Sequence, residues 1–385
     1  MGIFGNIRGI KNIGIIGFSN LIGSGISALF WIYLAGVMGA ENYGELSFYI
    51  SIAGITTSLS FIGGPMAITV LVAKKIEIGS TIHLFSILGS ILAAIILYFA
   101  FINIGLSIYV LGAVIYNLGV SELLGRKFYK KYSLYFILQK ILFVLLSLIL
   151  YYVIGPEGVL VAIGLSFMPF MIPIYTSFKN TPINFQLLKT KWRFMANNFF
   201  IDLSQVFNGQ IDKLVIGPIF GFTILGNYYL AIQILNLLAV MPEIVQKYTL
   251  PEDSSRINTT KIKLLTIGFS VILALIGVFI APEIIPIFFP DYGQALELIP
   301  IISICIVPTT ISTLYVSKFL AHEKSGYVVI VNIISIIILI IGIIYLGEIF
   351  GVIGLAYSLL ISDTSKALIF FYLNSMKKNL LTPNN

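Results

Sequence analysis

The chain has little of what soluble proteins use to fold and to catalyse reactions. Only 10% of its 385 residues are charged, whereas a typical soluble domain carries about 25%. Its one cysteine, Cys305, excludes an internal disulfide and any multi-cysteine metal site. Two histidines, His83 and His322, are too few for a histidine-rich metal or catalytic centre. Phosphate-loop, Gly-x-Ser-x-Gly and His-Glu-x-x-His motifs are missing too, so we expect no enzyme, cofactor or metal.

Apolar segments take the place of the missing charges. Hydrophobic residues make up 58% of the chain, and a membrane-spanning helix needs about 20 of them in succession. We therefore predict an all-α, polytopic membrane protein with about twelve transmembrane helices. The predicted spans are 13–37, 46–72, 82–102, 104–124, 134–154, 159–178, 194–219, 224–246, 264–287, 297–320, 327–346 and 350–373.

Lysine and arginine are confined to alternate connections between these spans. All of them except Lys140, Lys213 and Lys366 lie in or at the edge of the N-terminal segment, every second loop or the C-terminal tail. The intervening loops carry acidic residues and no basic ones. Because cytoplasmic loops are rich in lysine and arginine, both termini are predicted to be cytoplasmic. The net charge of +7 therefore indicates membrane orientation, and no nucleic-acid partner is expected.

A glycine-bounded turn occurs at corresponding places in the two halves. The first span is followed by Gly39-Ala-Glu-Asn-Tyr-Gly44 and the seventh by Gly221-Phe-Thr-Ile-Leu-Gly226. These turns recur by chance or mark a duplicated six-span unit. A duplication would give two six-helix lobes related by a pseudo-two-fold axis along the membrane normal, with the substrate between them. The lobes would be 1–178 and 194–385, joined by a cytoplasmic loop at 179–193.

The seventh span carries the most coherent set of polar residues within a predicted membrane segment. They recur every three or four positions, so they share one helix face. Because lipid satisfies no polar group, such a stripe faces either a hydrated cavity or hydrogen-bonding neighbours in a dry bundle. Its members are Asn198, Asp202, Gln205, Asn208 and Asp212.

Lys213 follows this stripe and is a basic residue in the outer part of the membrane, against the orientation rule. It either binds an anionic headgroup or neutralises a nearby aspartate. Asp212 is expected to be a poor partner, because adjacent residues on a helix do not face each other. The eighth span has a weaker polar face that includes Asn236, and in the twelfth Asp363 and Lys366 are expected to pair.

Several segments in order carry a resemblance. They are Gly39–Gly44, Ile211–Gly217 with Gly226–Ala231, Phe289–Leu296, and Ala321–Ala356. Their pattern resembles that of polysaccharide biosynthesis proteins, the Wzx-type O-antigen flippases, over nearly the whole chain. This resemblance implies the fold of the multidrug/oligosaccharidyl-lipid/polysaccharide exporter (MOP) superfamily. It also implies transfer of a polyprenyl-(pyro)phosphate-linked oligosaccharide from the inner to the outer leaflet of the cell membrane.

Related flippases hold the phosphate with arginines of the N-terminal lobe, and this chain departs from that pattern. On the resemblance, Lys213 would contact the phosphate, with Lys140 or Lys366 as alternatives. Coupling to H⁺ or Na⁺ would use Asp202 and Asp212. The other expected partners are membrane lipids and further polysaccharide-assembly proteins. Sugar-contacting residues would be Asn198, Gln205, Asn208 and Asn236.

Three other function classes are alternatives for a polytopic membrane protein of this kind. An ion-coupled multidrug or organic-cation antiporter of the same superfamily would bind cations with Asp202 and Asp212. A membrane glycosyltransferase or polymerase needs a sizeable loop with a carboxylate cluster, and the longest loops here are short and basic. A major facilitator carrier would show its Gly-x-x-x-Asp-Arg-x-Gly-Arg signature, which is absent from Ala73–Gly79.

Overall fold

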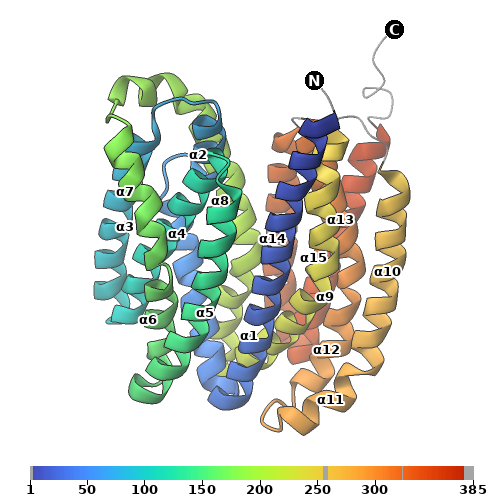
Figure 1. Cartoon of the computed structure of the whole chain (residues 1–385). Coiled ribbons are helices and arrows are strands. Elements are labelled where there is room, and N and C mark those ends of the chain that lie inside the picture. The colour runs from blue at the N-terminus through green and yellow to red at the C-terminus, as the bar shows by residue number, and fades with distance from the viewer. Residues whose placement is uncertain (1–2, 255–258, 323, 377–385) are drawn as a thin grey trace. The chain divides into compact units, whose positions relative to one another are not determined.

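Figure 1 shows the computed structural model of the chain, which describes residues 3–254, 259–322 and 324–376. Throughout these residues the regular elements are helices, which confirms the all-α class. In chain order they are α1 (Ile3–Leu59), α2 (Gly64–Ala73), α3 (Gly79–Phe101), α4 (Ile104–Gly125), α5 (Tyr129–Ile154), α6 (Glu157–Ser166), the short 3₁₀ helix η1 (Met168–Phe170), α7 (Met171–Asn180), α8 (Phe185–Phe220), α9 (Phe222–Ser254), α10 (Thr260–Phe279), α11 (Ala281–Phe288), α12 (Ala295–Ile304), α13 (Ile306–Ala321), α14 (Ser325–Phe350) and α15 (Val352–Met376).

The helices gather into two compact units that interleave along the chain. Unit 1 comprises Met1–Phe30 and Phe48–Val206, and unit 2 comprises Trp31–Ser47 and Phe207–Asn385. The long helices α1 and α8 therefore contribute to both units. The assignment of six spans to each lobe, with a connection at 179–193, stays a prediction.

Nine of the described helical segments are long and apolar enough to cross a membrane, or ten when the bent pair α12 and α13 counts as one span. Two features explain why the sequence predicts about twelve spans, more than the nine or ten found by this criterion. The 57-residue helix α1 contains a break at Gly39 and holds the first predicted span and much of the second. The 36-residue helix α8 holds the seventh, whose polar stripe lowers its hydropathy. The chain is a multi-pass membrane protein. The cytoplasmic placement of its termini stays a prediction, and Arg256, Lys377 and Lys378 lie outside the described residues.

The second predicted span, 46–72, is wrong as a single helix. α1 ends at Leu59 and α2 begins at Gly64, and the intervening turn includes Gly63. Gly63 and Gly64 have φ of 92° and 71°, a backbone conformation that glycine adopts without the steric penalty of a Cβ. Pro65 follows as the second residue of α2, in the first turn, where its missing N–H costs no helical hydrogen bond. The Gly-Gly-Pro sequence therefore breaks the span.

The stretch 179–193, predicted as a loop, is helical in its second part because α8 begins at Phe185. Asn184 precedes this helix, and its side-chain oxygen accepts a hydrogen bond from the backbone N–H of Leu187 at 3.0 Å. This is the geometry of a helix N-cap. Leu187 and Leu188 pack against the core of unit 1, which stabilises the first turns of α8.

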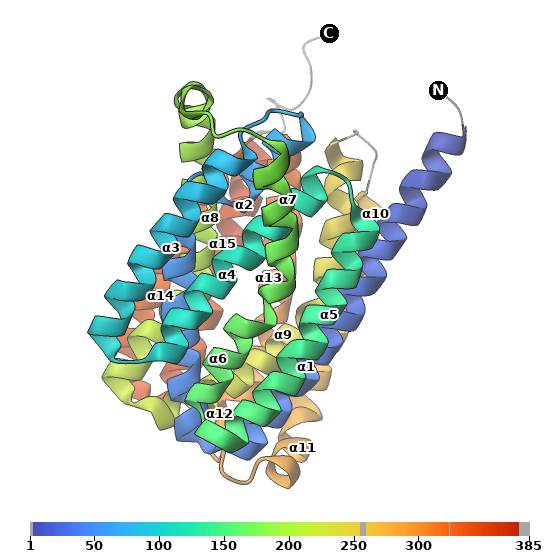
Figure 2. The ribbon, with the colours of Figure 1, turned by 60° about the vertical axis from the view of Figure 1, so that its left-hand side comes forward.

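Unit 1 is built largely from α2 to α7, and Figures 1 and 2 show α3, α4 and α7 side by side. Small residues let membrane helices approach closely. A Cβ added to Gly112 of α4 would lie 2.3 Å from the carbonyl oxygen of Gly164 of α6, so these two backbones are in direct contact. One buried apolar cluster of this unit comprises Phe61, Ala67, Ile68, Leu71, Ile78, Ile82, Val114, Leu118, Ile174 and Met195.

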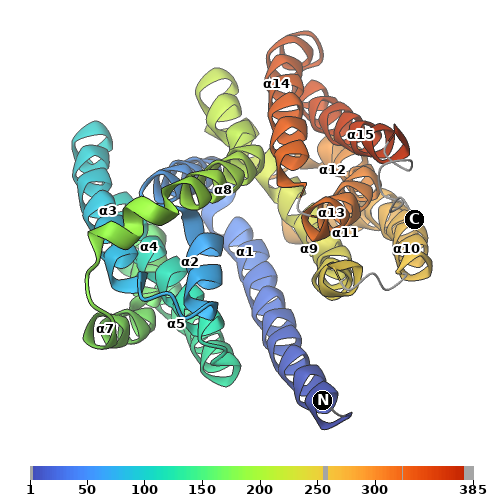
Figure 3. The same ribbon diagram turned by 90° about the horizontal axis from the view of Figure 1, so that it is seen from above.

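Unit 2 contains α9 to α15, and α14 shows how its helices are oriented. One face of α14 is an exposed stripe of isoleucine, whereas Asn332 and Ser335 on another face are buried. Figure 3 shows α14 running beside α15, against which it packs closely. Apolar side chains outside and polar ones inside are expected when a helix faces lipid on one side. The exposed stripe comprises Ile330, Ile333, Ile337, Ile341 and Ile344.

Candidate functional site

A hydrogen-bonded polar network joins three helices of unit 2. Lys366 Nζ of α15 donates to Asn208 Oδ1 of α8 at 2.9 Å. The Asn208 amide nitrogen lies 3.4 Å from Ser335 Oγ of α14, which in turn lies 2.9 Å from Ser362 Oγ of α15. The Ser362 hydroxyl also donates to the Ser335 carbonyl oxygen at 2.8 Å. One residue of the predicted stripe, Asn208, therefore positions an ammonium group within the membrane helices.

The expected ion pair between Asp363 and Lys366 is replaced by bonds to other helices. Lys366 reaches α8, as above, and Asp363 Oδ2 accepts a hydrogen bond from Thr309 Oγ1 of α13 at 2.9 Å. Their i, i+3 spacing permits pairing, but α8 and α13 supply hydrogen-bond partners to Lys366 and Asp363 within unit 2. The structure therefore corrects this expectation.

A second buried group lies one turn further along α8. Asp212 and Lys213 are each 5% exposed, and Lys213 Nζ lies 3.0 Å from Asp212 Oδ1. The same carboxylate oxygen accepts the backbone N–H of Lys213 at 2.9 Å, and Tyr228 of α9 donates its hydroxyl to Asp212 Oδ2 at 3.0 Å. Lys213 Nζ also donates to the carbonyl oxygen of Gly209 at 2.8 Å.

This geometry corrects the expectation that Asp212 is a poor partner for Lys213. The lysine side chain folds back along its own helix, and the carboxylate folds forward over the Lys213 backbone N–H. Burial provides the reason, because an unpaired charge in this surrounding costs far more than the strain of a close pair. The ion pair agrees with the alternative in which Lys213 neutralises an aspartate, and binding of an anionic headgroup by Lys213 stays a prediction.

The N-terminal part of the stripe lies in unit 1. Asp202 Oδ2 accepts a hydrogen bond from Ser58 Oγ of α1 at 2.7 Å. Asp202 also packs against the first residue of α2, because a Cβ on Gly64 would lie 3.3 Å from the Asp202 Cβ. A carboxylate near a helix N-terminus is favoured by the orientation of the peptide dipoles. The glycine break therefore makes room for a partly buried carboxylate.

The remaining predicted residues are less engaged. The Asn198 amide donates to the carbonyl oxygen of Phe194 in its own helix at 2.9 Å. Gln205 and Asn236 are exposed. Lys140 Nζ lies 5.2 Å above the centre of the Phe136 ring, a cation–π contact within unit 1.

The compact units divide the stripe. Asn198, Asp202 and Gln205 belong to unit 1, whereas Asn208 and Asp212 belong to unit 2. Substrate-binding and ion-coupling roles for these residues stay predictions. Sequence reasoning missed the serine, threonine and tyrosine partners, because such residues occur in most spans and only the packing shows which of them join these polar contacts. These partners are Ser58, Tyr228, Thr309, Ser335 and Ser362.

The two glycine-bounded turns meet in unit 2. A Cβ on Gly44 would lie 1.9 Å from the carbonyl oxygen of Phe222, and one on Gly226 would lie 1.8 Å from that of Ala40. Each turn also contains a positive φ, 73° at Gly39 and 92° at Gly221. The repeat seen in the sequence thus forms a reciprocal backbone contact, in which each turn uses its second glycine to approach the other.

Aromatic residues of three motif segments surround this contact. The Tyr43 ring lies 5.0 Å from the Tyr229 ring and 6.3 Å from the Tyr292 ring, measured between ring centres. Tyr292 donates its hydroxyl to the carbonyl oxygen of Ala35 at 2.7 Å. Three of the segments that carry the sequence resemblance, far apart along the chain, therefore meet in one buried cluster in unit 2.

Solved structures match the chain over almost its full length. The lipid II flippase MurJ in an inward closed conformation aligns with a TM-score of 0.78 and 14% identity, over 94% of this chain and 87% of that chain. An inward-facing multidrug resistance MATE family transporter of the MOP superfamily aligns with a TM-score of 0.71 and 16% identity, over 94% and 95%. A MOP superfamily transporter from Pyrococcus furiosus aligns with a TM-score of 0.64 and 16% identity, over 95% of each chain. Its description notes a binding pocket of reverse polarity.

These likenesses show the fold. No protein-family model matches the chain, and no curated protein matches it significantly. At 14% and 16% identity the solved structures leave the substrate open, because they include both multidrug transporters and a lipid flippase. The chain has the fold of MOP superfamily transporters, as the sequence resemblance implied.

Proposed function

We propose that this protein flips a polyprenyl-(pyro)phosphate-linked oligosaccharide from the inner to the outer leaflet of the cell membrane. Alternating access would open the substrate site to one side of the membrane at a time, and the product would feed cell-surface polysaccharide assembly. The MOP fold supports a carrier, and the clustered motif segments support a lipid-linked sugar as its cargo.

The physical problem for such a carrier is the polar headgroup. Its lipid tail stays in the bilayer, but moving sugars and phosphate through hydrocarbon without partners costs several kcal/mol for each polar group. The polar face of α8 offers amides and charges along most of its membrane-embedded length. Asn198, Gln205 and Asn208 supply amides for sugar hydroxyls, and Asn236 of α9 supplies another.

The observation that carries the proposal is the ammonium of Lys366 held on Asn208 Oδ1 at 2.9 Å. An ammonium has three N–H donors, and this bond uses one of them. The sequence resemblance assigns the phosphate contact to Lys213, whose ammonium already donates to Gly209 and Asp212. Lys366 therefore joins Lys213 as the group proposed to meet the phosphate.

Coupling to H⁺ or Na⁺ is assigned to Asp202 and Asp212. Asp202 accepts a hydrogen bond from Ser58 and carries no lysine beside it among the described salt bridges, so its carboxylate suits a transient cation. Asp212 already holds Lys213. A coupling ion at Asp212 would displace the Lys213 ammonium. Ion binding would then release Lys213 to contact the phosphate.

A leaflet assay tests the function. The protein is reconstituted in proteoliposomes with a labelled polyprenyl-pyrophosphate oligosaccharide, and an impermeant sugar-modifying reagent is added outside. Wild-type protein should speed modification of the inner-leaflet substrate relative to empty vesicles. Lys366→Ala should lower the rate about tenfold or more, because a charge-assisted hydrogen bond contributes about 1.5–3 kcal/mol. Lys213→Ala should also reduce it.

Matched variants separate chemistry from folding. Lys261→Ala removes an exposed lysine at the start of α10 and should leave the rate unchanged. Lys366→Arg keeps the charge and should retain more activity than Lys366→Ala. If folded wild-type protein does not accelerate the modification, the proposed function is contradicted.

The alternative is an ion-coupled multidrug or organic-cation antiporter. The partly buried Asp202 carboxylate favours it, since an organic cation needs a negative partner. In the same vesicles, uptake of a fluorescent organic cation driven by an imposed H⁺ or Na⁺ gradient, and lost in Asp202→Asn, would support the antiporter. Flipping without cation uptake supports the flippase.

A further inference from the structure

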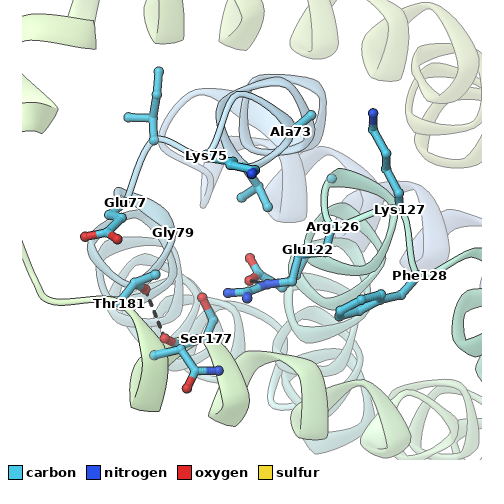
Figure 4. A pocket seen from close by; sticks show the side chains of 14 residues that line it. Ala73, Lys75, Glu77, Gly79, Glu122, Arg126, Lys127, Phe128, Ser177 and Thr181 are labelled. Carbon is cyan, nitrogen blue, oxygen red and sulfur yellow. Dashed lines mark hydrogen bonds and ion pairs between the residues drawn. The ribbon is translucent and has the colours of Figure 1, made fainter. Parts of the chain in front are cut away.

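A pocket of about 470 Å³ with several charged residues in its lining lies in unit 1, away from the polar face of α8. It is bounded by the connection from α2 to α3, the connection from α4 to α5, and the C-terminal end of α7 (Figure 4). The charge pattern of the sequence predicts that this end of the helices faces the cytoplasm. Its volume is within the range of about 300–1,000 Å³ typical of small-ligand sites.

The first of these connections ends α2 with a lysine where glycine is preferred. The backbone N–H of Ile76 donates to the Leu71 carbonyl at 3.0 Å, and that of Lys75 donates to the Val72 carbonyl at 2.9 Å. This pair of bonds is the Schellman motif, whose central residue is usually glycine because its φ is positive. Here that residue is Lys75, with φ of 58°.

The second connection repeats the arrangement at the end of α4. The backbone N–H of Phe128 donates to the Leu123 carbonyl at 2.8 Å, and that of Lys127 donates to the Leu124 carbonyl at 3.0 Å. Lys127 has φ of 62°. A left-handed backbone is unfavourable for a residue with a Cβ, and strained residues concentrate at functional sites. Two strained lysines lining one pocket indicate that their charge, rather than their fit to the turn, matters here.

The floor of the pocket holds buried oxygens without hydrogen-bond partners. Glu122 is 2% exposed; its Oε1 pairs with Arg126 Nε, while its Oε2 has no hydrogen bond. Ser177 Oγ is also buried and unpartnered. His83 Nε2 lies 3.7 Å from Glu122 Oε2, beyond hydrogen-bond distance. Figure 4 shows Arg126 and Glu122 together, with Ser177 nearby.

Gly79 leaves the space beside these two oxygens open. A Cβ on Gly79 would lie 3.1 Å from Ser177 Oγ and 3.4 Å from Glu122 Oε2. A buried oxygen without a hydrogen bond lowers stability, and a ligand that donates a hydrogen bond to it would remove that cost. The pocket therefore presents acceptors for hydroxyl groups on its floor and lysine ammonium groups at its rim.

We propose that this pocket binds a phosphate ester that carries free hydroxyls. The phosphate contacts Lys75 and Lys127, which are exposed and lie at the two strained turns. The hydroxyls donate to Glu122 Oε2 and reach Ser177 Oγ. Glu77 also lines the pocket, so its carboxylate and that of Glu122 offset two of the three cationic groups. The ligand is therefore a small ester with hydroxyls as well as phosphate, rather than a highly charged polyanion.

Phosphate esters are the abundant anionic groups where the ends of membrane helices meet the cytoplasmic leaflet. The cytoplasmic leaflet is negatively charged, and basic residues at the ends of membrane helices contact its headgroups. A glycerol-phosphate lipid headgroup and a soluble sugar or polyol phosphate share the chemistry that the pocket recognises. The two sources are distinguished by experiment.

The binding test uses the full chain in phosphatidylcholine nanodiscs. One arm measures binding of radiolabelled sn-glycerol 3-phosphate by equilibrium dialysis. The other adds phosphatidylglycerol to the nanodiscs and counts the lipid retained by the protein with native mass spectrometry. Binding in the first arm assigns a soluble ligand, and binding in the second alone assigns a lipid headgroup; either result supports the pocket.

Paired charge removals test the residues. Lys75→Gln with Lys127→Gln should weaken binding at least about tenfold, because the loss of even one charge-assisted bond lowers affinity by about that factor. Lys74→Gln with Lys130→Gln removes the same charge from the end of α2 and the start of α5, outside the pocket lining, and should change affinity less than twofold. Equal loss in both pairs, or no binding of either probe to the wild-type protein, overturns the proposal.

A second pair of variants keeps the test independent of folding. Lys75→Gly with Lys127→Gly removes the charges while giving both turns the residue that their positive φ favours. This variant should lose the ligand with a melting temperature equal to or above that of the wild type. Gly79→Ala should weaken binding by narrowing the floor. Full binding by the double glycine variant contradicts the assignment.

Discussion

The backbone nitrogen of Gly226 lies 2.6 Å from the place a Cβ on Gly44 would occupy, so these glycines hold two chain segments in backbone contact. Gly44→Ala and Gly226→Ala should each lower the free energy of unfolding by about 1–3 kcal/mol, because the added methyl must push a backbone away. Thermal unfolding in detergent measures this loss.

Gly268→Ala is the matched control, since Gly268 is a helical glycine of unit 2 with nothing within 4 Å of its added Cβ. This change should be neutral or stabilising by up to about 1 kcal/mol. If Gly44→Ala were as stable as Gly268→Ala, the reciprocal contact between the turns would be wrong.

The bond between Asn208 and Lys366 should appear as an energetic coupling. In a double-mutant cycle, Asn208→Ala and Lys366→Met should couple by about 1.5 kcal/mol, the contribution of a hydrogen bond to a charged group. The free energy of unfolding of the four proteins gives this value. Asn208→Ala combined with Lys261→Met should show no coupling, and a coupling of zero in the first cycle would refute the bond.

Asp212→Asn should lower the free energy of unfolding more than a substitution between side chains of equal size usually does. The change leaves the Lys213 ammonium buried without its ion pair, which should cost about 3–5 kcal/mol of unfolding free energy. Adding Lys213→Met should recover much of this loss, because the unpaired charge is then gone.

Tyr228→Phe is the milder comparison at the same carboxylate. It removes only the hydroxyl that donates to Asp212 Oδ2, and should cost about 1 kcal/mol. Thermal unfolding of the single and double variants provides the measurement. A double variant no more stable than Asp212→Asn would show that the ion pair is not the cause.

Tyr292, in the connection between α11 and α12, should make stability depend on alkaline pH. Burial first, and then the neighbouring Asp291 carboxylate, raise the pKa of its phenol. Because the pKa of Tyr292 is higher in the folded than in the unfolded chain, the neutral phenol contributes fully to stability below the unfolded-state pKa of about 10. This contribution declines as the pH rises through and beyond that pKa.

The free energy of unfolding should therefore fall between about pH 9 and 11, and this fall should be smaller in Tyr292→Phe, which cannot ionise. Tyr372→Phe, at an exposed tyrosine, is the matched control and should follow the wild type. Identical pH profiles for wild type and Tyr292→Phe would contradict the contribution of Tyr292.

The polar site was foreseen in part. Spacing alone placed Asn208 and Asp212 on one face of α8, because helical periodicity fixes which residues share a face. The partners of these residues lie on α9, α14 and α15, and nothing in the local sequence indicates which serine, tyrosine or lysine of another helix comes within 3 Å. The Asp212–Lys213 pair was missed for a different reason, since flexible side chains can meet where their Cα–Cβ bonds diverge.

The sequence by itself determined that the chain is helical and lies in a membrane. Few charges and many apolar runs leave no other way to satisfy the backbone in lipid, and that requirement acts on each segment separately. Tertiary structure alone decided that the two glycine turns meet and that Lys366 reaches Asn208. Such contacts depend on how whole helices pack, and packing is set by many small side chains acting together rather than by any local pattern.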